Sequence, residues 1–222
     1  ADFTWSYSSL KQYQNCPKQY YEIRVLKNYT VKENKAMIYG KEVHTALENY
    51  VRDGVELAKN YQRFKPVVDS LIQIEGKKMC EYKMALTFHK EPCDFEDKNR
   101  WVRGIADLVI VDGTDAYIID YKTGSNKYPD SKQLKLMAIM LFTHMPEVVK
   151  VKAGLLFIMK NSFLTEEYHR KDMDKLWKSF EQPLKRLETS YDYNKWEANP
   201  TPLCGWCSVD TCEFYRPKFF PS

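Results

Sequence analysis

The spacing of apolar residues changes along the chain, and each change predicts a different element. Two apolar runs, Trp101–Val111 and Ala116–Tyr121, flank Asp-Gly-Thr-Asp and predict the strands of a β-hairpin. Ala36–Asp53 carries apolar residues at helical spacing and predicts a helix. The remaining predictions are helices at Leu10–Cys16 (with Pro17 opening a second helical segment or kinking the first), Asn60–Met79, Lys132–Phe142 and Thr165–Tyr191, strands at Glu81–Phe88 and Val149–Met159, and a loop at residues 89–100.

The hairpin strands are apolar on both faces. Leu108, Ile110, Tyr117 and Ile119 fall on one face, and Val109, Val111, Ala116 and Ile118 fall on the other. Such strands are typical of a sheet that is covered on both sides. The order of elements therefore predicts a three-layer α/β/α domain with a mixed central sheet. We expect residues 1–222 to form one domain, in which residues 199–216 are a Cys-rich C-terminal segment stapled to the N-terminal helix.

The hairpin also brings two carboxylates together. Gly113 at the first position of a two-residue loop suits a type II′ turn, and this register places Asp107 directly opposite Asp120. Like charges in such a pair repel each other. Lys122 lies two residues beyond Asp120 and points to the same face. Each aspartate alone could simply cap or end a strand, but the three together suit a divalent metal that activates a water molecule.

Composition sets broad limits. The 222 residues are 44% apolar and 14% aromatic, which favours a packed globule over a disordered chain. No apolar run approaches the roughly 20 residues that span a bilayer, and no signal-peptide pattern opens the sequence, so we expect a cytoplasmic protein without membrane association. The net charge of +4 permits nucleic-acid binding but also fits an ordinary mixed surface.

The motifs around these residues carry a resemblance. Asp107 followed by Asp120-Tyr-Lys122 resembles the core of the PD-(D/E)XK nuclease superfamily, which implies a restriction-endonuclease-like fold. Three further segments resemble the RecB/AddB-type branch, which includes phage and bacterial exonucleases. They are Gly40-Lys-Glu-Val-His44-x-x-Leu-Glu, Gln133-Leu-x-Leu-Met, in which Met137 replaces the family's Tyr, and the opening Ser8-x-Leu10-x-x-Tyr-x-x-Cys16-Pro-x-x-Tyr20.

The resemblance implies roles for individual residues. Lys122 would assist the attacking water, and Gln133 would lie along the DNA path. Glu81 matches an acidic position of related phage exonucleases, so it either touches the metal and its waters or lies beside them. Mg²⁺ or Mn²⁺ would be held by His44, Asp107, Asp120 and the carbonyl of Tyr121. By itself, a histidine on an amphipathic helix is more often an ordinary core residue than a ligand.

The cysteines form a second candidate site. Cys204, Cys207 and Cys212 lie close together near the C-terminus, and Cys16 stands far from them in sequence. This one-plus-three layout resembles the iron–sulfur subset of RecB-type nucleases, which implies a structural [4Fe–4S] cluster. Zinc, or no metal at all, remains an alternative. Cys80 and Cys93 have no ligand-like spacing and are expected to be plain thiols.

The combined motifs predict a metal-dependent DNA nuclease, most simply an exonuclease that acts on DNA ends or single strands in recombination, repair or replication. A helicase or recombination partner would fit that setting. Two other classes stay open. A catalytically inactive nuclease fold could bind DNA or a partner, and a redox protein could be built on the cysteines.

Overall fold

The computed structural model describes residues 3–215, which divide into two compact units. The sheet unit contains Asn34–Trp177 together with a few residues before Trp5. The helical unit contains Trp5–Glu33 and the chain from Lys178 onward. None of the helices in the described part combines the length and apolar character that a bilayer-spanning segment needs.

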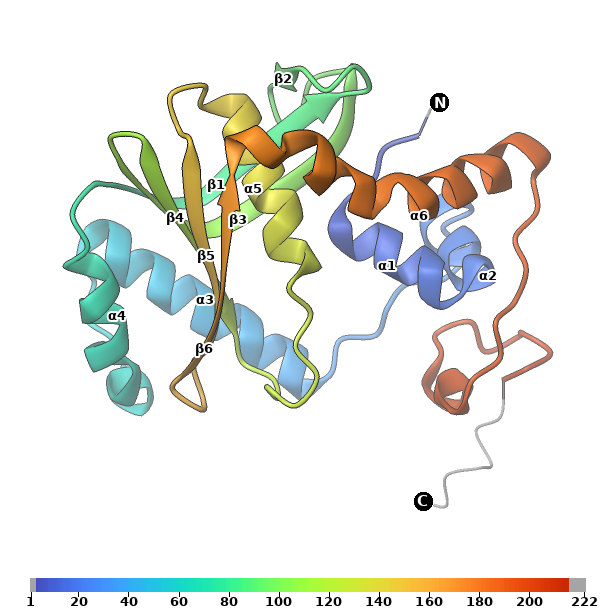
Figure 1. The fold of residues 1–222 in the computed structure, drawn as a ribbon. Helices are drawn as coiled ribbons and strands as arrows, with labels where there is room; N and C mark the ends of the chain where they lie inside the picture. Colours follow the sequence, from blue (N-terminus) through green and yellow to red (C-terminus); the bar gives the residue numbers. More distant parts are fainter. Residues whose placement is uncertain (1–2, 216–222) are drawn as a thin grey trace. The chain divides into compact units, whose positions relative to one another are not determined.

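The sheet unit is built on six strands in the order β2-β1-β3-β4-β5-β6 (Figure 1). Only β4 and β5 pair in parallel, and the other neighbours are antiparallel, so the sheet is mixed as predicted. The strands are β1 (Lys77–Thr87), β2 (Pro92–Cys93), β3 (Arg100–Asp112), β4 (Asp115–Lys122), β5 (Lys150–Phe157) and β6 (Ser162–His169).

Helices cover both faces of this sheet, which confirms the predicted three-layer α/β/α architecture (Figure 1). On one face, α3 (Lys35–Asp53), the 3-10 segment η2 (Lys59–Phe64) and α4 (Lys65–Ile72) bury a cluster that includes Leu108 and Ile119. On the other face lies α5 (Lys132–His144), eight of whose thirteen residues are buried. The predicted apolar faces of the hairpin are therefore the faces that pack.

The hairpin register agrees with the sequence prediction. Gly113 has a φ of 63°, as a type II′ turn requires at its first central position. The β3–β4 ladder then runs from Asp112 opposite Asp115 to Leu108 opposite Ile119. The ladder fixes which side chains of the two strands lie next to each other at the end far from the turn.

Two element predictions were wrong. The helix predicted over Asn60–Met79 ends at Ile72, and it could not reach Met79 because Gly76 has a φ of 135°, outside the helical region, just before β1 begins. The helix predicted over Thr165–Tyr191 begins only at Met173, after the edge strand β6 and the short 3-10 turn η3 (Arg170–Asp172). Half of the residues of β6 are exposed and only one is buried, so the strand lacks the apolar alternation that would have identified it.

The helical unit contains α1 (Tyr7–Asn15), α2 (Pro17–Tyr20), the π-helical turn η1 (Tyr21–Val25), the larger part of α6 (Met173–Tyr193) and the 3-10 turn η4 (Pro202–Trp206). Ser6 caps α1, and Pro17 opens α2 at a position where its missing N–H costs nothing. The Tyr13 hydroxyl donates a hydrogen bond to the carbonyl oxygen of Arg186 at 2.9 Å. Trp196 stacks on Tyr21 with ring centroids 4.9 Å apart.

Candidate active site

The β3–β4 ladder stops one residue before the two aspartates. The last pair is Leu108 opposite Ile119, and beyond it the Asp107 carboxylate oxygen Oδ2 accepts a hydrogen bond from the backbone N–H of Tyr121 at 2.8 Å. The expected direct pairing of Asp107 with Asp120 is therefore replaced by a contact between a side chain and the backbone. This contact holds Asp107 next to the end of β4.

The strand on the other side of β3 is distorted at the same level. Glu81 has a φ of 49°, in the left-handed region that non-glycine residues rarely adopt. Leu108 packs beneath α3, whereas a side chain at Gly104 would meet Met137 of α5. Residues four apart in a regular strand face the same side of the sheet. Leu108 and Gly104 face opposite sides, so the alternation of side chains along β3 reverses between them. Glu81 and Asp107 lie at this reversal, which the sequence pattern did not reveal.

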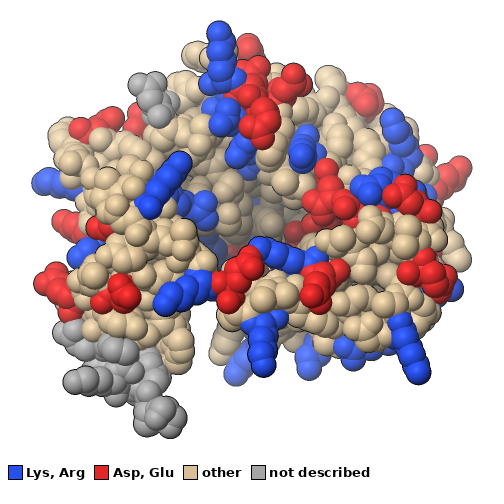
Figure 2. All heavy atoms as spheres, turned by 180° about the vertical axis from the view of Figure 1, so that it is seen from behind, with Lys and Arg blue, Asp and Glu red and all other residues tan. Residues whose placement is uncertain are grey.

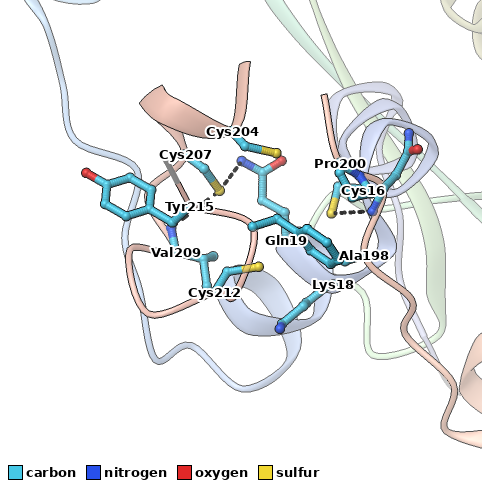
Figure 3. Close-up of a pocket in the computed structure, with 12 residues that line it drawn as sticks. Cys16, Lys18, Gln19, Ala198, Pro200, Cys204, Cys207, Val209, Cys212 and Tyr215 are labelled. Carbon is cyan, nitrogen blue, oxygen red and sulfur yellow. Dashed lines mark hydrogen bonds between the residues drawn. The ribbon is translucent and has the colours of Figure 1, made fainter. Parts of the chain in front are cut away.

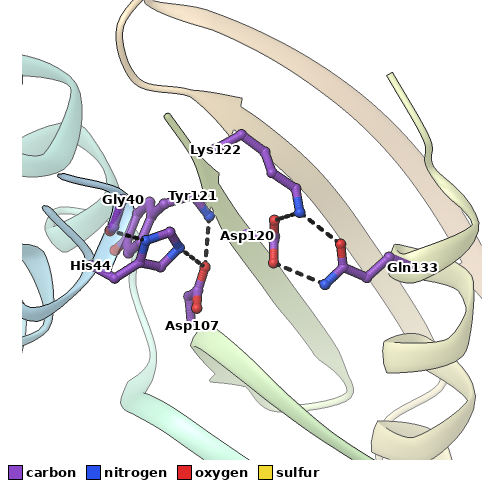
Figure 4. A network of polar contacts seen from close by, with 7 residues as sticks. All are labelled: Gly40, His44, Asp107, Asp120, Tyr121, Lys122 and Gln133. Carbon is purple, nitrogen blue, oxygen red and sulfur yellow. Dashed lines mark hydrogen bonds and ion pairs between the residues drawn. The ribbon is translucent and has the colours of Figure 1, made fainter. Parts of the chain in front are cut away.

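His44, on helix α3, lies next to Asp107. His44 Nε2 lies 3.2 Å from Asp107 Oδ2, and Nδ1 lies 2.7 Å from the carbonyl oxygen of Gly40 (Figure 4). The hydrogen bond with Asp107 raises the pKa of His44 to about 9, although partial burial opposes the shift. A Cβ at Gly40 would lie 3.1 Å from the Thr123 hydroxyl, so glycine permits the close approach of α3 to the end of β4.

Asp120 is buried and belongs to a second set of contacts (Figure 4). Lys122 Nζ lies 2.9 Å from Asp120 Oδ2 and donates a hydrogen bond to Gln133 Oε1 at 2.8 Å. Gln133 Nε2 in turn donates to Asp120 Oδ1 at 3.4 Å. Apart from the ammonium group of Lys122, no donor among the described residues reaches Oδ2 of Asp120. Burial, and then the charge of Asp107, raises the pKa of Asp120 to about 6.

Further acids surround these side chains. Burial, followed by the charges of Asp107 and Glu48, raises the pKa of Glu81. A groove of about 1140 Å³ is lined by His44, Glu48, Glu81 and Asp107 together with basic residues such as Lys83. These carboxylates share a partly desolvated space, where the charges of Asp107 and Glu48 disfavour the ionisation of Glu81. A bound cation would relieve that repulsion.

The structure thus brings the predicted residues together in two adjoining sets. His44, Asp107 and the backbone of Tyr121 form one set, and Asp120, Lys122 and Gln133 form the other. Within residues 3–215, no three His, Cys, Asp or Glu side chains stand close enough to hold a metal as they are arranged. Bringing the carboxylates of Asp107 and Asp120 onto one ion requires side-chain movement.

The cysteines predicted to bind a cluster all border one small pocket of the helical unit (Figure 3). Three of the four sulfurs accept hydrogen bonds from backbone N–H groups. They are Cys16 from Asn199 at 3.5 Å, Cys204 from Thr201 at 3.3 Å and Cys207 from Val209 at 3.4 Å. The four sulfurs do not form a metal-binding group in the described part of the chain. None of the six cysteines is in a disulfide, and Cys80 borders the acidic groove instead.

Known proteins resemble this chain in sequence pattern and in fold. The profile of the PD-(D/E)XK nuclease superfamily matches residues 4–212. A protein from Eubacterium rectale, provisionally assigned as an exonuclease, has a similar structure with a TM-score of 0.55 and 11% identity, over 100% of this chain and 90% of that one. The protein SSO0001 matches with a TM-score of 0.50 and 13% identity, over 97% of this chain and 89% of its own.

At these identities the two structures support a similar fold and nothing further. A search of curated proteins finds no significant match. The profile match, by contrast, extends over nearly the whole chain and includes every residue of the acidic groove. The chain belongs to the PD-(D/E)XK nuclease superfamily.

Proposed function

We propose that this protein is a nuclease that requires Mg²⁺ or Mn²⁺ and hydrolyses DNA from an end. The observation that carries the proposal is the buried Asp120 carboxylate, because burial and the charge of Asp107 raise its pKa even though the Lys122 ammonium lies 2.9 Å from its Oδ2 atom. An ionised carboxylate in such a place is costly unless a cation compensates it. The proposed ligands are His44, Asp107, Asp120 and the main-chain carbonyl of Tyr121.

This donor set suits a hard divalent ion. Carboxylate and carbonyl oxygens are preferred by Mg²⁺ and Mn²⁺, and one imidazole is compatible with Mn²⁺. Such an ion lowers the pKa of a bound water and neutralises charge on a phosphoryl oxygen. Glu81 faces Asp107 closely enough for the two charges to influence each other, so we assign it to the ion or to its water shell.

Lys122 is the residue that we assign to the attacking water. Its ammonium group is held between Asp120 and Gln133, at 2.9 and 2.8 Å. Once Asp120 turns its charge toward a cation, the ammonium can donate a hydrogen bond to a water or to a phosphoryl oxygen. Gln133 keeps the ammonium beside the reacting atoms, which adds a positioning role to the DNA contact inferred from its motif.

DNA as the substrate, and its ends as the place of attack, are inferred from the superfamily and from the exonuclease assignment of the protein with similar structure. The surface is compatible with a polyanion without being strongly basic. Figure 2 shows Lys and Arg mixed with Asp and Glu over the displayed face, in keeping with a net charge of +4. A role in recombination, repair or replication, beside a helicase or recombination protein, would suit such an enzyme.

We further propose that Cys16, Cys204, Cys207 and Cys212 bind a structural [4Fe–4S] cluster. Their placement around one pocket supports this, as do the N–H groups that point at three of the sulfurs. Closing a cluster requires the sulfurs to move inward. Purification without oxygen, a visible spectrum and metal analysis test the proposal. Broad charge-transfer absorption with four irons per chain is expected, whereas zinc alone or no metal would overturn it.

The nuclease proposal is tested with end-labelled linear DNA and closed circular single-stranded DNA in the presence of Mn²⁺. We expect the linear DNA to be degraded and the circle to persist, with the activity lost in Asp120→Asn. Cutting of the circular DNA would show that the protein is an endonuclease and not an exonuclease. If a folded, metal-loaded protein binds DNA without cleaving it, the result would support the alternative of a catalytically inactive nuclease fold that binds DNA.

A further inference from the structure

Lys83 occupies an unusual place in the acidic groove. It is exposed, it lines the groove, and it lies on β1 two residues beyond Glu81. Its pairing partner on β3 is Ile105, which in turn lies two residues from Asp107. Two residues of a strand span roughly 7 Å. Lys83 is therefore set one step along the sheet from the carboxylates that we assign to metal binding.

An aromatic residue supports the Lys83 side chain. The ammonium lies 5.5 Å from the ring centroid of Phe95, and the Arg103 guanidinium lies 4.3 Å from the same ring. Arg103 also donates a hydrogen bond to the carbonyl oxygen of Phe95 at 3.3 Å and pairs with Glu96 at 3.2 Å. The loop after β2 is thereby tied to β3, and the ring restrains Lys83 through a cation–π contact.

Lys83 forms no ion pair with a carboxylate of the described residues. Among the described residues, no Asp or Glu lies within ion-pair distance of its ammonium group. Arg52, another cation of the groove, is paired with Glu48 at 3.3 Å and with Asp53 at 3.2 Å. A cation held in place beside a groove of acids, but paired with none of them, is suited to an anionic ligand.

Such a cation suits the groove, whose lining also contains the basic residues Lys41 and Arg52. A polynucleotide carries a phosphate at every nucleotide, and the carboxylates around His44 would repel each phosphate that a metal does not neutralise. If the scissile phosphate lies at the metal, the neighbouring phosphate must lie several ångströms away along the groove. Lys83 stands at about that distance on the sheet wall.

We propose that Lys83, restrained by Phe95, binds the backbone phosphate next to the scissile one and so sets the path of the strand across β1 and β3. The inference rests on the proposed function, because it takes DNA as the ligand and the acidic groove as the place of cleavage. The contact is to phosphate alone, so it would be independent of base sequence.

The test measures binding without cleavage. Asp120→Asn serves as the parent, and a fluorescein-labelled single-stranded oligodeoxynucleotide is titrated by anisotropy at several KCl concentrations and a fixed low Mg²⁺ concentration. Each phosphate neutralised on a single strand contributes about −0.7 to the slope of log K against log salt. We expect Lys83→Gln to make the slope shallower by about 0.7 and to weaken binding at low salt.

Lys77→Gln is the matched control, because Lys77 is an exposed lysine at the opposite end of the same strand and does not line the groove. It should leave slope and affinity unchanged. The proposal is overturned if Lys83→Gln behaves like the parent, if both variants change alike, or if the parent does not bind. Failure of the proposed function shows separately, as absence of cleavage by the wild-type protein whatever the binding data say.

Discussion

Metal binding at the acidic groove should expel a proton from His44. Nε2 of His44 faces Asp107 at 3.2 Å, and this contact raises the pKa of the imidazole to about 9. The ring is therefore protonated at pH 7, since only about one molecule in a hundred is neutral two units below the pKa. A protonated imidazole cannot ligate a metal, so the ion and the proton compete.

The structure gives the size of this competition. Two pH units correspond to about 2.7 kcal/mol, the free energy needed to deprotonate His44 at pH 7. The apparent affinity for Mn²⁺ should rise about tenfold per pH unit between pH 7 and 9 and then level off. Below about pH 6 the dependence should steepen, because Asp120, whose pKa is about 6, then also takes up a proton.

Isothermal titration calorimetry measures the proton directly. Mn²⁺ is titrated at pH 7 in two buffers of different ionisation enthalpy, and the difference in heat gives the number of protons released. We expect close to one for the wild type and close to none for His44→Gln, whose affinity should vary little between pH 7 and 9. An unchanged proton count in His44→Gln, or no release by the wild type, would refute the reasoning.

Three further perturbations follow. The pKa of Asp120 is raised to about 6 in the folded chain, so ionisation of this carboxyl group destabilises the fold as pH rises through 6. Asp120→Asn should therefore increase the unfolding free energy of the metal-free protein at pH 7 by about 1–3 kcal/mol and raise its thermal midpoint. A lower midpoint would contradict this. Gln133→Leu removes the acceptor that holds Lys122, and it should lower kcat on the order of 10²-fold while Mn²⁺ affinity in calorimetry stays the same; an unchanged kcat would exclude the positioning role. Gly76→Ala places a Cβ 2.6 Å from the carbonyl oxygen of Val111 at a φ of 135°, and it should destabilise the protein by about 2–4 kcal/mol in urea unfolding, whereas a loss below about 0.5 kcal/mol would show that the turn relaxes.

The sequence predicted best what local patterns determine. A glycine at the first position of the hairpin loop set the register of β3 and β4, and the apolar faces of those strands followed from their alternation. The same alternation could not show that it reverses near Asp107, at the level where Glu81 of the neighbouring strand adopts a left-handed backbone. Period-based reasoning assumes regular strands and fails at such a distortion.

The site shows the same division. The motifs group His44, Asp107, Asp120 and Lys122 in one site, and the structure places these side chains in one region of the sheet unit, where their elements adjoin. The hydrogen bonds of Gln133 to Lys122 and Asp120 depend on how α5 docks on the sheet, which no local pattern encodes. The support of Lys83 by Phe95 likewise arises only when the loop after β2 folds back over β1.

The most direct test of the account is the rate at which labelled linear DNA is hydrolysed with Mn²⁺ or with a chelator, by wild type, Asp120→Asn and Asp112→Asn. Asp112 is an exposed aspartate on β3, outside the groove, and it controls for loss of an acid from the hairpin. The account predicts that wild type and Asp112→Asn cleave only with metal and that Asp120→Asn falls to background. Cleavage by Asp120→Asn at the wild-type rate, or cleavage by wild type in chelator, would contradict it.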